Sequence, residues 1–451
     1  MLPLAQIVHG MGHEVGGSDR SRDQGRTIEK FEWLEKAGFE LFPQEGSGIT
    51  SSDQILVASA AVEDTVPEVK RAAEFGCERL SRAELLSTLF NQAGYSISVG
   101  GTSGKSTVTG MIAWILSEGG YNPTVMNGAV MKNFAADQTP FARARIGRPE
   151  IFVSEVDESD GSIALYRPTI GVLLNVSLDH KSLEELRVLF GNYVREAGCA
   201  VVNFDNEEAA FLAAKASQLV SFGVHNTKAD ITVEPDSIEE GPLRVSAAVR
   251  DNRTREAFPL VVPMPGRHNL SNALAAIAAA SAAGISVKSA TYALRSFAGL
   301  ARRFDVVGST PNGITVIDDF GHNPEKCAAT LRTLKATPVR GLSCFQPHCY
   351  VPLRQMGDEL SQTFADELGP DDITILCAPV YYGGTVDRSE GSERIVDLIR
   401  QHGGQAEHVP SRDACADRLV DLAREGDRVV IMGARDDTLS AFAQGVFERL
   451  E

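Results

Sequence analysis

Short apolar runs alternate along the chain with longer stretches in which apolar residues recur at helical spacing. Residues 52–62 form an apolar run that ends in a loop, and residues 67–76 follow with an amphipathic pattern. That second stretch begins with proline and closes with glycine, as helices commonly do. Short strands separated by amphipathic helices indicate βαβ units around a parallel sheet, so the pattern predicts an α/β protein.

The length of the chain predicts several domains, because 451 residues are too many for one hydrophobic core. Changes in the strand and helix pattern place the boundaries near residues 94 and 299. We therefore expect an N-terminal domain over 1–94, a central domain over 95–299 and a C-terminal domain over 300–451. In the central part, several apolar runs each end in polar or acidic residues, which is where parallel sheets carry their ligands.

The beginning of the chain departs from the usual order of a Rossmann-like unit, in which a strand and a glycine turn precede the first helix. Here residues 2–12 already have the pattern of that helix, and residues 13–19 have the pattern of the second strand. We therefore expect a Rossmann-like N-terminal domain that lacks its first strand and glycine loop.

Composition excludes several classes of partner. A formal charge of −17 argues against nucleic acid and anionic membranes, because no basic excess is available to neutralise phosphates. No apolar stretch approaches the ~18 residues of a membrane helix. Seven scattered cysteines are typical of free thiols in a reducing compartment, so we expect a cytoplasmic protein. Cys344, His348 and Cys349 are close in sequence, but no second ligand pair follows, so we expect no zinc site there.

Residues 99–111, VGGTSGKSTVTGM, resemble a phosphate-binding loop with unusual spacing. The common loop would place glycine at position 99, where this chain has Val99. The stretch nevertheless follows a strand-like run and opens an amphipathic helix, the context in which backbone amides cradle phosphates. Lys105 would reach the outer phosphates and the Ser106 hydroxyl would bind Mg²⁺. The predicted phosphate cradle comprises Gly101, Thr102, Ser103, Gly104, Lys105, Ser106 and Thr107.

An acidic segment, EVDESDGS, ends the next apolar run. Its four carboxylates repel one another unless a cation or a helix N-terminus offsets them. Beside a phosphate-binding loop, Mg²⁺ is the natural cation, whereas an isolated segment of this kind would more often be a solvated turn. The carboxylates belong to Glu155, Asp157, Glu158 and Asp160.

Three further clusters lie at predicted strand ends or helix starts. Asn175, Asp179 and His180 follow one strand, and His268, Asn269 and Asn272 open an alanine-rich helix, where asparagine could equally serve as a cap. The third cluster combines arginines for bidentate phosphate binding with aspartates that could accept a ribose hydroxyl, although a surface ion pair is the alternative. It contains Arg302, Arg303, Asp318, Asp319, His322 and Asn323.

Taken in order, the motifs GTSGKST, EVDESDGS, NVSLDH, GRHNLSNALAA, RRF, DDFGHNP and FQPH resemble the Mur ligase family over nearly the whole chain. The family makes peptidoglycan precursors, and its shorter glycine loop accounts for the spacing after Val99. The resemblance implies a Rossmann-like UDP-sugar domain, a central ATPase and a C-terminal Rossmann-like domain. It further implies an ATP-dependent ligase that joins a UDP-sugar acid to an amino acid through an acyl phosphate, with UDP-N-acetylmuramate and L-alanine as the best-matching substrates.

The resemblance also implies roles for individual residues. Lys105 contacts the β- and γ-phosphates, and Ser106 and Glu155 hold the first Mg²⁺, which Mn²⁺ could replace. His180 helps to hold a second metal ion. Further implied contacts are Asn269 with adenine, Arg303 and Asp319 with the nucleotide, His322 and His348 with the incoming amino acid, and Ser18, Asp19, Asp157 and Ser159 with the UDP-sugar.

Some positions depart from the family pattern. Cys349 and Pro352 stand where arginines are expected, and Ser103 and Asn323 replace histidines. The lost cations leave two alternatives open. One is a related ligase with another acceptor or amino acid, as in muropeptide recycling, polyglutamylation or cyanophycin synthesis, and the other is a nucleotide-binding homologue without activity. A monomer or a homodimer is expected.

Overall fold

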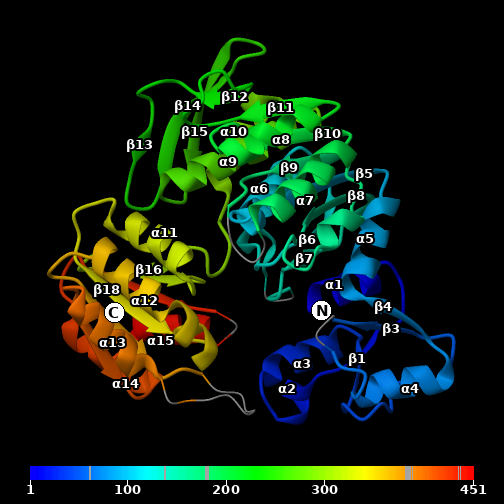
Figure 1. The fold of residues 1–451 in the computed structure, drawn as a ribbon, viewed down its shortest axis with the longest axis horizontal. Coiled ribbons are helices and arrows are strands. Elements are labelled where there is room, and N and C mark those ends of the chain that lie inside the picture. The colour runs from blue at the N-terminus through cyan, green and yellow to red at the C-terminus, as the bar shows by residue number, and fades with distance from the viewer. Residues whose placement is uncertain are drawn as a thin grey trace. The chain divides into compact units, whose positions relative to one another are not determined.

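Figure 1 shows the computed structural model, which describes residues 1–59, 62–136, 139–177, 182–380, 388, 390–434, 436 and 438–451. The chain forms two compact units. The first contains Met1–Ser237, Ala247–Leu260 and Ser271–Phe297, and the second contains Ile238–Ser246, Val261–Leu270 and Ala298–Glu451. Within the described ranges, no helix is long and apolar enough to cross a membrane.

The N-terminal part of the first unit consists of short strands and helices that alternate. Two small parallel sheets form, one from β1 and β2 and the other from β3 and β4. The predicted helix at 67–76 is confirmed as α4, which starts at Pro67 and ends before Gly76 in the left-handed region. The elements are α1 (Leu2–Gly10), β1 (Gly16–Ser18), α2 (Arg20–Asp23), α3 (Ile28–Lys36), β2 (Glu40–Phe42), β3 (Ile55–Ala58), α4 (Pro67–Phe75), β4 (Glu78–Ser81) and α5 (Arg82–Gln92).

A largely parallel sheet follows, whose strands belong wholly or mainly to this unit except for β13 (Glu239–Glu240), which belongs to the second. β5 (Tyr95–Gly100) lies near the middle of the sheet, between β8 (Arg148–Glu155) and β9 (Ile170–Leu173). All three run parallel, so their carboxyl ends meet at one edge. The other parallel strands are β6 (Pro123–Met126), β10 (Cys199–Asn203), β11 (Leu219–Phe222) and β12 (Ile231–Val233), and antiparallel pairs add β7 (Ala144–Arg145), β13 (Glu239–Glu240) and β14 (Val245–Asp251), with β15 (Glu256–Val262) beside β14.

Helices connect these strands, and the long runs predicted as helical are confirmed. The glycine loop after β5 leads directly into α6 (Lys105–Glu118). The α-helices that follow are α7 (Leu183–Glu196), α8 (Glu207–Leu212), α9 (Arg267–Ala282) and α10 (Val287–Ala293), and the 3₁₀ turns are η1 (Lys132–Phe134), η2 (Ser162–Leu165), η3 (Ala213–Lys215) and η4 (Leu294–Ser296).

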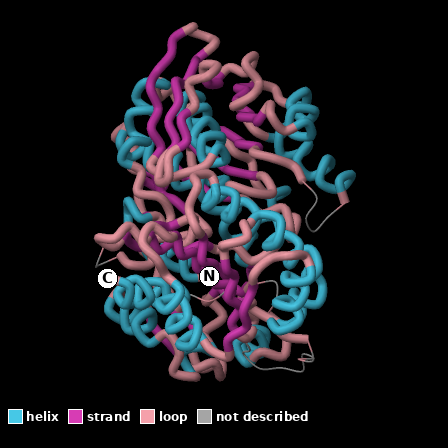
Figure 2. Tube along the Cα trace, turned by 90° about the vertical axis from the view of Figure 1, so that its left-hand side faces the viewer, coloured by secondary structure: helices cyan, strands magenta, loops and turns pink. Residues whose placement is uncertain are grey.

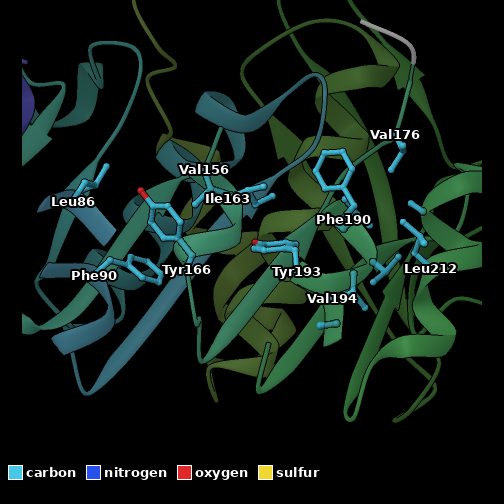
Figure 3. Close-up of a cluster of buried hydrophobic side chains, with 14 of the residues drawn as sticks. Leu86, Phe90, Val156, Ile163, Tyr166, Val176, Phe190, Tyr193, Val194 and Leu212 are labelled. Atoms are coloured by element: carbon cyan, nitrogen blue, oxygen red, sulfur yellow. The ribbon is translucent and has the colours of Figure 1, made fainter. Parts of the chain in front are cut away.

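An aromatic core holds β5 in place (Figure 3). Phe90 of α5 meets the Tyr166 ring edge-on at 5.1 Å, and Phe190 of α7 is fully buried. The Tyr193 hydroxyl lies 2.7 Å from the Ser98 hydroxyl and donates to the Ser98 carbonyl at 2.9 Å, so it satisfies polar groups of β5 inside the core. Burying an aromatic ring stabilises the fold by about 2–3 kcal/mol, which makes β5 a firm support for the loop that follows it.

The second unit contains a six-stranded sheet with the order β16-β17-β21-β18-β19-β20, parallel except for the β16–β17 pair. One face packs on α11, α12 and α13, and the other packs on α14 and α15. Figure 2 distinguishes the helices of the chain from its strands by colour. The elements are β16 (Asp305–Ser309), β17 (Thr315–Asp319), α11 (Pro324–Lys335), β18 (Gly341–Gln346), α12 (Tyr350–Glu367), β19 (Ile373–Cys377), α13 (Ser392–Gln401), β20 (Ala406–Val409), α14 (Arg412–Leu422), β21 (Arg428–Gly433) and α15 (Leu439–Leu450).

The predicted α/β class with parallel sheets is confirmed, including the layered Rossmann-like arrangement of the C-terminal part. The predicted domain boundaries at residues 94 and 299 stay a prediction. The sequence pattern did not reveal β16 or β20, which are short edge strands of the second sheet.

Candidate active site

At two positions of the glycine loop after β5, only glycine fits the backbone. Gly101 has φ 138°, and a Cβ there would lie 3.0 Å from Cβ of Leu174 and 3.1 Å from the Asn175 nitrogen. Gly104 has φ 87°, and its Cβ would lie 2.6 Å from Oδ1 of Asn272. Both glycines therefore allow a positive φ and a close approach that a side chain would prevent.

Asn175, which follows β9, fastens this loop. Its Oδ1 accepts from the Ser103 N–H at 2.8 Å, and its Nδ2 donates to the Ser103 carbonyl at 3.0 Å. The Thr102 N–H donates to the Asn175 carbonyl at 3.2 Å. The sequence placed Asn175 at a strand end but gave no role for it. Paired contacts to the N–H and the carbonyl of one residue hold the loop in a single conformation.

The loop ends at the N-terminus of α6, where Lys105 is the first helical residue. The N-cap position is Gly104, which has no side chain that could cap the helix. The first N–H groups of a helix lack acceptors inside the helix, and together with the helix dipole they attract anions. The predicted cradle from Gly101 to Thr107 therefore has the backbone of a phosphate site.

Ser106 and Glu155, the predicted ligands of the first metal ion, lie in direct contact. The Ser106 hydroxyl donates to Oε2 of Glu155 at 2.6 Å. The sheet register explains this, because Val99 at the end of β5 pairs with Glu155 at the end of β8. Gly128 leaves room for the carboxylate, since a Cβ there would lie 2.2 Å from Oε1 of Glu155. A hydroxyl and a carboxylate beside a phosphate cradle are the oxygen ligands that Mg²⁺ uses, so this pair fits the metal.

Lys105 forms a largely buried ion pair with Glu158. Its Nζ lies 2.6 Å from Oε2 of Glu158, and the two side chains are 18% and 8% exposed. The sequence grouped Glu158 with the metal-binding carboxylates and did not anticipate this contact. The pair keeps the lysine charge compensated within the loop, and a phosphate that reached Lys105 would compete with Glu158 for it.

Asp157 lies between these charged groups and stays ionised. Burial opposes its ionisation, but the N–H and hydroxyl of Ser159 and the charges of Lys105 and Arg82 outweigh that effect and lower its pKa. The Ser159 N–H donates to Oδ1 of Asp157 at 2.9 Å, which forms a tight turn after β8. Ser159 thus fixes the conformation of the acidic segment. Its contact with a sugar substrate stays a prediction.

An open cavity of about 190 Å³ adjoins the loop within the first unit. Its lining includes Lys105, Glu155 and Asp157 together with two cations, Arg82 at the start of α5 and Arg143 before β7. Neither arginine belongs to a recognisable motif, so the sequence did not indicate either of them. They come from segments on either side of the glycine loop and meet it only through the fold. The cavity therefore combines the predicted phosphate and metal groups with positive charge for an anionic ligand.

Ser18 and Asp19, predicted for the UDP-sugar, have contacts within the N-terminal part. The Ser18 hydroxyl donates to Oε1 of Glu68 at 2.9 Å. Asp19 caps α2 by accepting from the Ser21 N–H at 2.8 Å, and Lys30 lies 3.6 Å from its other oxygen. Neither is among the described residues that line the cavity. Their contact with a substrate stays a prediction.

In the second unit, two predicted residues support the backbone. Arg302 donates to the carbonyls of Gly433 at 2.6 Å and Asp436 at 2.9 Å. Asp319 accepts from the N–H groups of Phe304 and Gly321 at 2.7 and 2.8 Å, and it also accepts from a threonine hydroxyl of α11. Both side chains are buried. Arg302 thus fixes the end of β21, and Asp319 fixes the loop after β17 to α11. The nucleotide contact of Asp319 stays a prediction.

Arg303, His322 and His348 surround Phe320 and the loop after β17. The Arg303 guanidinium lies over the Phe320 ring at 4.7 Å, and the rings of His322 and His348 meet edge-on at 5.9 Å. Nδ1 of His322 lies 2.9 Å from the Phe320 carbonyl, which can only accept. Nδ1 therefore carries the proton. Burial lowers the pKa of His322 to about 4, so its Nε2 keeps a free lone pair at neutral pH.

The remaining predicted residues have varied positions. Asn269 is buried at the start of α9 and donates from Nδ2 to the Pro265 carbonyl at 2.7 Å. Its contact with adenine stays a prediction. Cys349, at a position where the family pattern has arginine, precedes α12 and is partly buried. His180, predicted for a second metal ion, lies outside the described residues.

A glycine loop at a helix N-terminus, with a hydroxyl and a carboxylate beside it, is typical of nucleotide-dependent enzymes, and comparison with known families identifies the class. Family models match residues 1–93 (Mur ligase family, catalytic domain), 99–280 (Mur ligase middle domain) and 302–435 (Mur ligase, glutamate ligase domain). The chain belongs to the Mur ligase family. It is an ATP-dependent ligase that forms a carbon–nitrogen bond, as the motifs implied.

Individual relatives cover nearly the full length. Proteins named UDP-N-acetylmuramate–L-alanine ligase from Chelativorans sp. and Mesorhizobium japonicum are 33% and 34% identical, and each match covers 98% of this chain and 94% of the relative. A crystal structure of UDP-N-acetylmuramate-alanine ligase from Thermotoga maritima shares the fold, with TM-score 0.79 at 24% identity over 100% of this chain and 96% of that one. A murein peptide ligase from Psychrobacter arcticus has TM-score 0.70 at 26% identity, with the same coverage.

Proposed function

We propose that this ligase joins L-alanine to the carboxylate of UDP-N-acetylmuramate, with cleavage of ATP, in the synthesis of peptidoglycan precursors. The observation that carries the proposal is the contact of Ser106 with Glu155 beside Lys105, at the rim of a cavity that also contains Arg82 and Arg143. The names of the full-length relatives favour these substrates over the alternatives.

The first step we propose is transfer of the γ-phosphoryl group of ATP to the substrate carboxylate. The amides at the start of α6 and the Lys105 ammonium bind the phosphates, and Lys105 exchanges Glu158 for them. Ser106 and Glu155 would hold Mg²⁺, which offsets the charge that develops when two anions react. The fixed loop conformation means that these groups need little reorganisation on binding.

Arg82 and Arg143 supply the charge that the sugar substrate requires. A UDP-sugar acid has a pyrophosphate and a carboxylate, and the chain as a whole is strongly acidic. Two guanidinium groups at one cavity bind such a ligand locally and with directional hydrogen bonds. We assign them to the acid or to its diphosphate, next to the phosphoryl group that Lys105 holds.

The second step is attack of the amino acid's amine on the acyl phosphate, which forms the amide and releases phosphate. The amine reaches this step as an ammonium ion and must lose a proton. We propose that the unprotonated Nε2 of His322 accepts it, with His348 orienting the amino acid. The Phe320 carbonyl fixes the tautomer that leaves Nε2 available.

One difference between this chain and the family pattern favours a second candidate for the substrate that supplies the amine. Cys349 and Pro352 replace the arginines of the family pattern, which removes two cations where a single amino acid's carboxylate should bind. A structural relative is a murein peptide ligase, so a short peptide is the alternative amine. The seven free cysteines favour a cytoplasmic location for either reaction.

The test is phosphate release from ATP and Mg²⁺ by the full chain, with each substrate omitted in turn and the product identified by mass spectrometry. We expect release only when UDP-N-acetylmuramate and an amine are both present, with L-alanine the best of the single amino acids. If the enzyme prefers an alanyl peptide to L-alanine, the peptide is the amine substrate and the proposed mechanism stands. Lys105→Met serves as the inactive control, and release that persists in it would exclude this site as the source.

A further inference from the structure

Three cysteines from distant parts of the second unit meet in its core. Sγ of Cys344 lies 3.0 Å from Sγ of Cys415 and 3.9 Å from Sγ of Cys377, and all three sulfur atoms lie within 4.8 Å of one another. Cys344 is on β18, Cys377 ends β19, and Cys415 is in the first turn of α14. Each is buried and free of a disulfide.

The strand register explains why these thiols converge. β18 and β19 are parallel, and Cys344 pairs with Ile375, so Cys377 lies two residues further along on the same face. That face packs on α14 and α15, where Cys415 points inward. The spacing of the sulfurs is close to what one ion requires, because ligands at a Zn–S distance of ~2.3 Å in tetrahedral or trigonal geometry are ~3.8–4.0 Å apart.

The chemistry of the donors selects a particular class of ion. Three thiol sulfurs favour soft, thiophilic cations such as Zn²⁺, Cd²⁺ or Cu⁺ and disfavour Mg²⁺. His408 is not a fourth ligand, although it lies on the neighbouring strand. It pairs with Leu376, whose side chain faces the opposite side of the sheet, and its Nδ1 lies 3.5 Å from a carboxylate oxygen of Glu393 on α13. Among the described residues, the donor set is therefore three sulfurs.

Metal binding at this cluster is coupled to proton release, because thiols bind metal ions as thiolates. A divalent ion that displaces three thiol protons leaves a net charge of −1 on the site. Arg412 begins α14, one turn from Cys415, and its guanidinium bonds to Asp436, Gln346 and Thr438.

We propose that Cys344, Cys377 and Cys415 form a binding site for one thiophilic d¹⁰ cation, held by three thiolates. The ion binds as M²⁺ + 3 RSH → [M(SR)₃]⁻ + 3 H⁺, with no change of oxidation state. It fastens β18, β19 and α14 to one another. β18 leads through Gln346 toward His348, so the ion also stiffens the support of that histidine. The site is independent of the substrates proposed above.

The test uses the full chain, purified in reducing, metal-free buffer and titrated with Cd²⁺ alone. We expect thiolate-to-metal absorption in the ultraviolet that saturates at one equivalent, and X-ray absorption of the cadmium complex that shows three sulfur neighbours. Cys415→Ala should weaken the binding by more than about 100-fold, because loss of a direct ligand exceeds the 10–100-fold effect of losing an outer-shell partner. Cys199→Ala, in the other unit, and Cys327→Ala, in the same unit, are the matched controls and should bind as the parent does.

The result does not depend on whether the variants fold, because the X-ray absorption experiment needs only the unchanged chain. Fewer than three sulfur neighbours, or coordination by oxygen and nitrogen, would overturn the proposal. Unchanged affinity in Cys415→Ala would overturn it as well. The third measurement is thermal: one equivalent of Cd²⁺ should raise the Tm of the parent and of Cys199→Ala and leave the Tm of Cys415→Ala unchanged. Equal shifts in all three chains would show that the cation acts elsewhere.

Discussion

Two clusters of polar residues at strand ends look alike in sequence and differ in the structure. Around the glycine loop, Lys105, Ser106 and Glu155 contact one another or a neighbouring carboxylate at the rim of a cavity. Around β17, Arg302 and Asp319 are buried and bonded to backbone groups of their own unit. The first cluster has charged groups that a ligand can engage by replacing a side-chain partner. In the second cluster, the charged side chains bond to the backbone and hold loops in place.

Charged residues in a sequence motif can therefore have one of two roles, ligand binding or support of the backbone. A charged side chain bonded to another flexible side chain can exchange that partner for a ligand at modest cost, whereas one bonded to buried backbone groups would leave them unsatisfied. Near β17, the candidates for chemistry are Arg303, which lies over the Phe320 ring, and the histidine pair His322 and His348, whose rings meet edge-on. The predictions that follow test this division, beginning with the largest effect.

Lys105→Met should abolish most of the activity. Removing the ammonium takes away the charge that stabilises the phosphoryl group in transfer, and we expect a loss of about 10³-fold or more in kcat/KM for ATP. Steady-state phosphate release measures it. Lys288→Met, an exposed lysine of α10, is the control and should retain parental kinetics. Near-parental activity of Lys105→Met would remove the loop from the mechanism.

Glu155→Gln should weaken the metal site while preserving the loop. Replacing the carboxylate by an amide removes a charged ligand, so we expect a loss of about 100-fold in kcat and a higher Mg²⁺ concentration for half-maximal rate. Rates measured across a Mg²⁺ titration give both values. Glu118→Gln, at the exposed end of α6, should behave as the parent does. An unchanged Mg²⁺ requirement in Glu155→Gln would contradict the assignment.

Arg82→Gln should raise the KM for the UDP-sugar acid with little effect on the KM for ATP. One lost charge-assisted hydrogen bond is worth about 1.5–3 kcal/mol, which corresponds to a rise of roughly 10–100-fold. Initial rates with one substrate varied at a time separate the two constants. Arg195→Gln, on the exposed side of α7, is the matched control. Equal effects on both KM values would mean that Arg82 supports the loop and does not select the sugar.

Asp319→Asn tests the other side of the comparison. The carboxylate accepts from two N–H groups and a hydroxyl, so the amide should lower the free energy of unfolding by about 1–3 kcal/mol. Urea unfolding measures the change, and Asp397→Asn on α13 is an exposed control. If Asp319→Asn kept full stability but lost ATP binding, the division between the clusters would be wrong.

The pH dependence of stability should report on His322. Its folded pKa is about 4, below the ordinary value of 6.5, because the ring is buried. The unfolded chain therefore binds a proton that the folded chain does not, and stability falls as the pH drops from 6.5 toward 4. Lys326, His348 and Arg303 also disfavour the charged ring, and the Phe320 carbonyl opposes them.

We expect His322 to account for about 1–2 kcal/mol of the stability lost between pH 6.5 and 5. Urea unfolding at both pH values, compared between the parent and His322→Asn, isolates this part from that of the buried His268, whose pKa burial also lowers. The variant should lose less stability over this interval. An identical slope in the two chains would mean that His322 has the same pKa in the folded and the unfolded chain.

The sequence predicted the fold class and the phosphate loop because both are local. Alternating strands and helices specify parallel α/β units, and the glycines at 101 and 104 mark a backbone that side chains cannot adopt. The contact of Ser106 with Glu155 follows once β8 is known to lie beside β5. That neighbour relation is set by sheet topology, which no single motif encodes.

What the sequence could not show depends on contacts between distant segments. The pairing of Lys105 with Glu158, and the approach of Arg82 and Arg143 to the same cavity, arise from packing. The three cysteines are another example, because His348 and Cys349 are the sequence neighbours of Cys344, whereas the fold joins it to Cys377 and Cys415. For Asp319, the type of residue suggested a ligand contact, but three buried donors already use its oxygens.

The central claim is that the groups around Lys105 transfer a phosphoryl group to a carboxylate before the amide forms. Its most direct test starts from UDP-N-acetylmuramate labelled with ¹⁸O in the carboxylate and follows the label during turnover with ATP and L-alanine. An acyl phosphate leaves one carboxylate oxygen on the released phosphate, so mass spectrometry should detect phosphate that carries a single ¹⁸O. Unlabelled phosphate, released together with the amide product, would contradict the account.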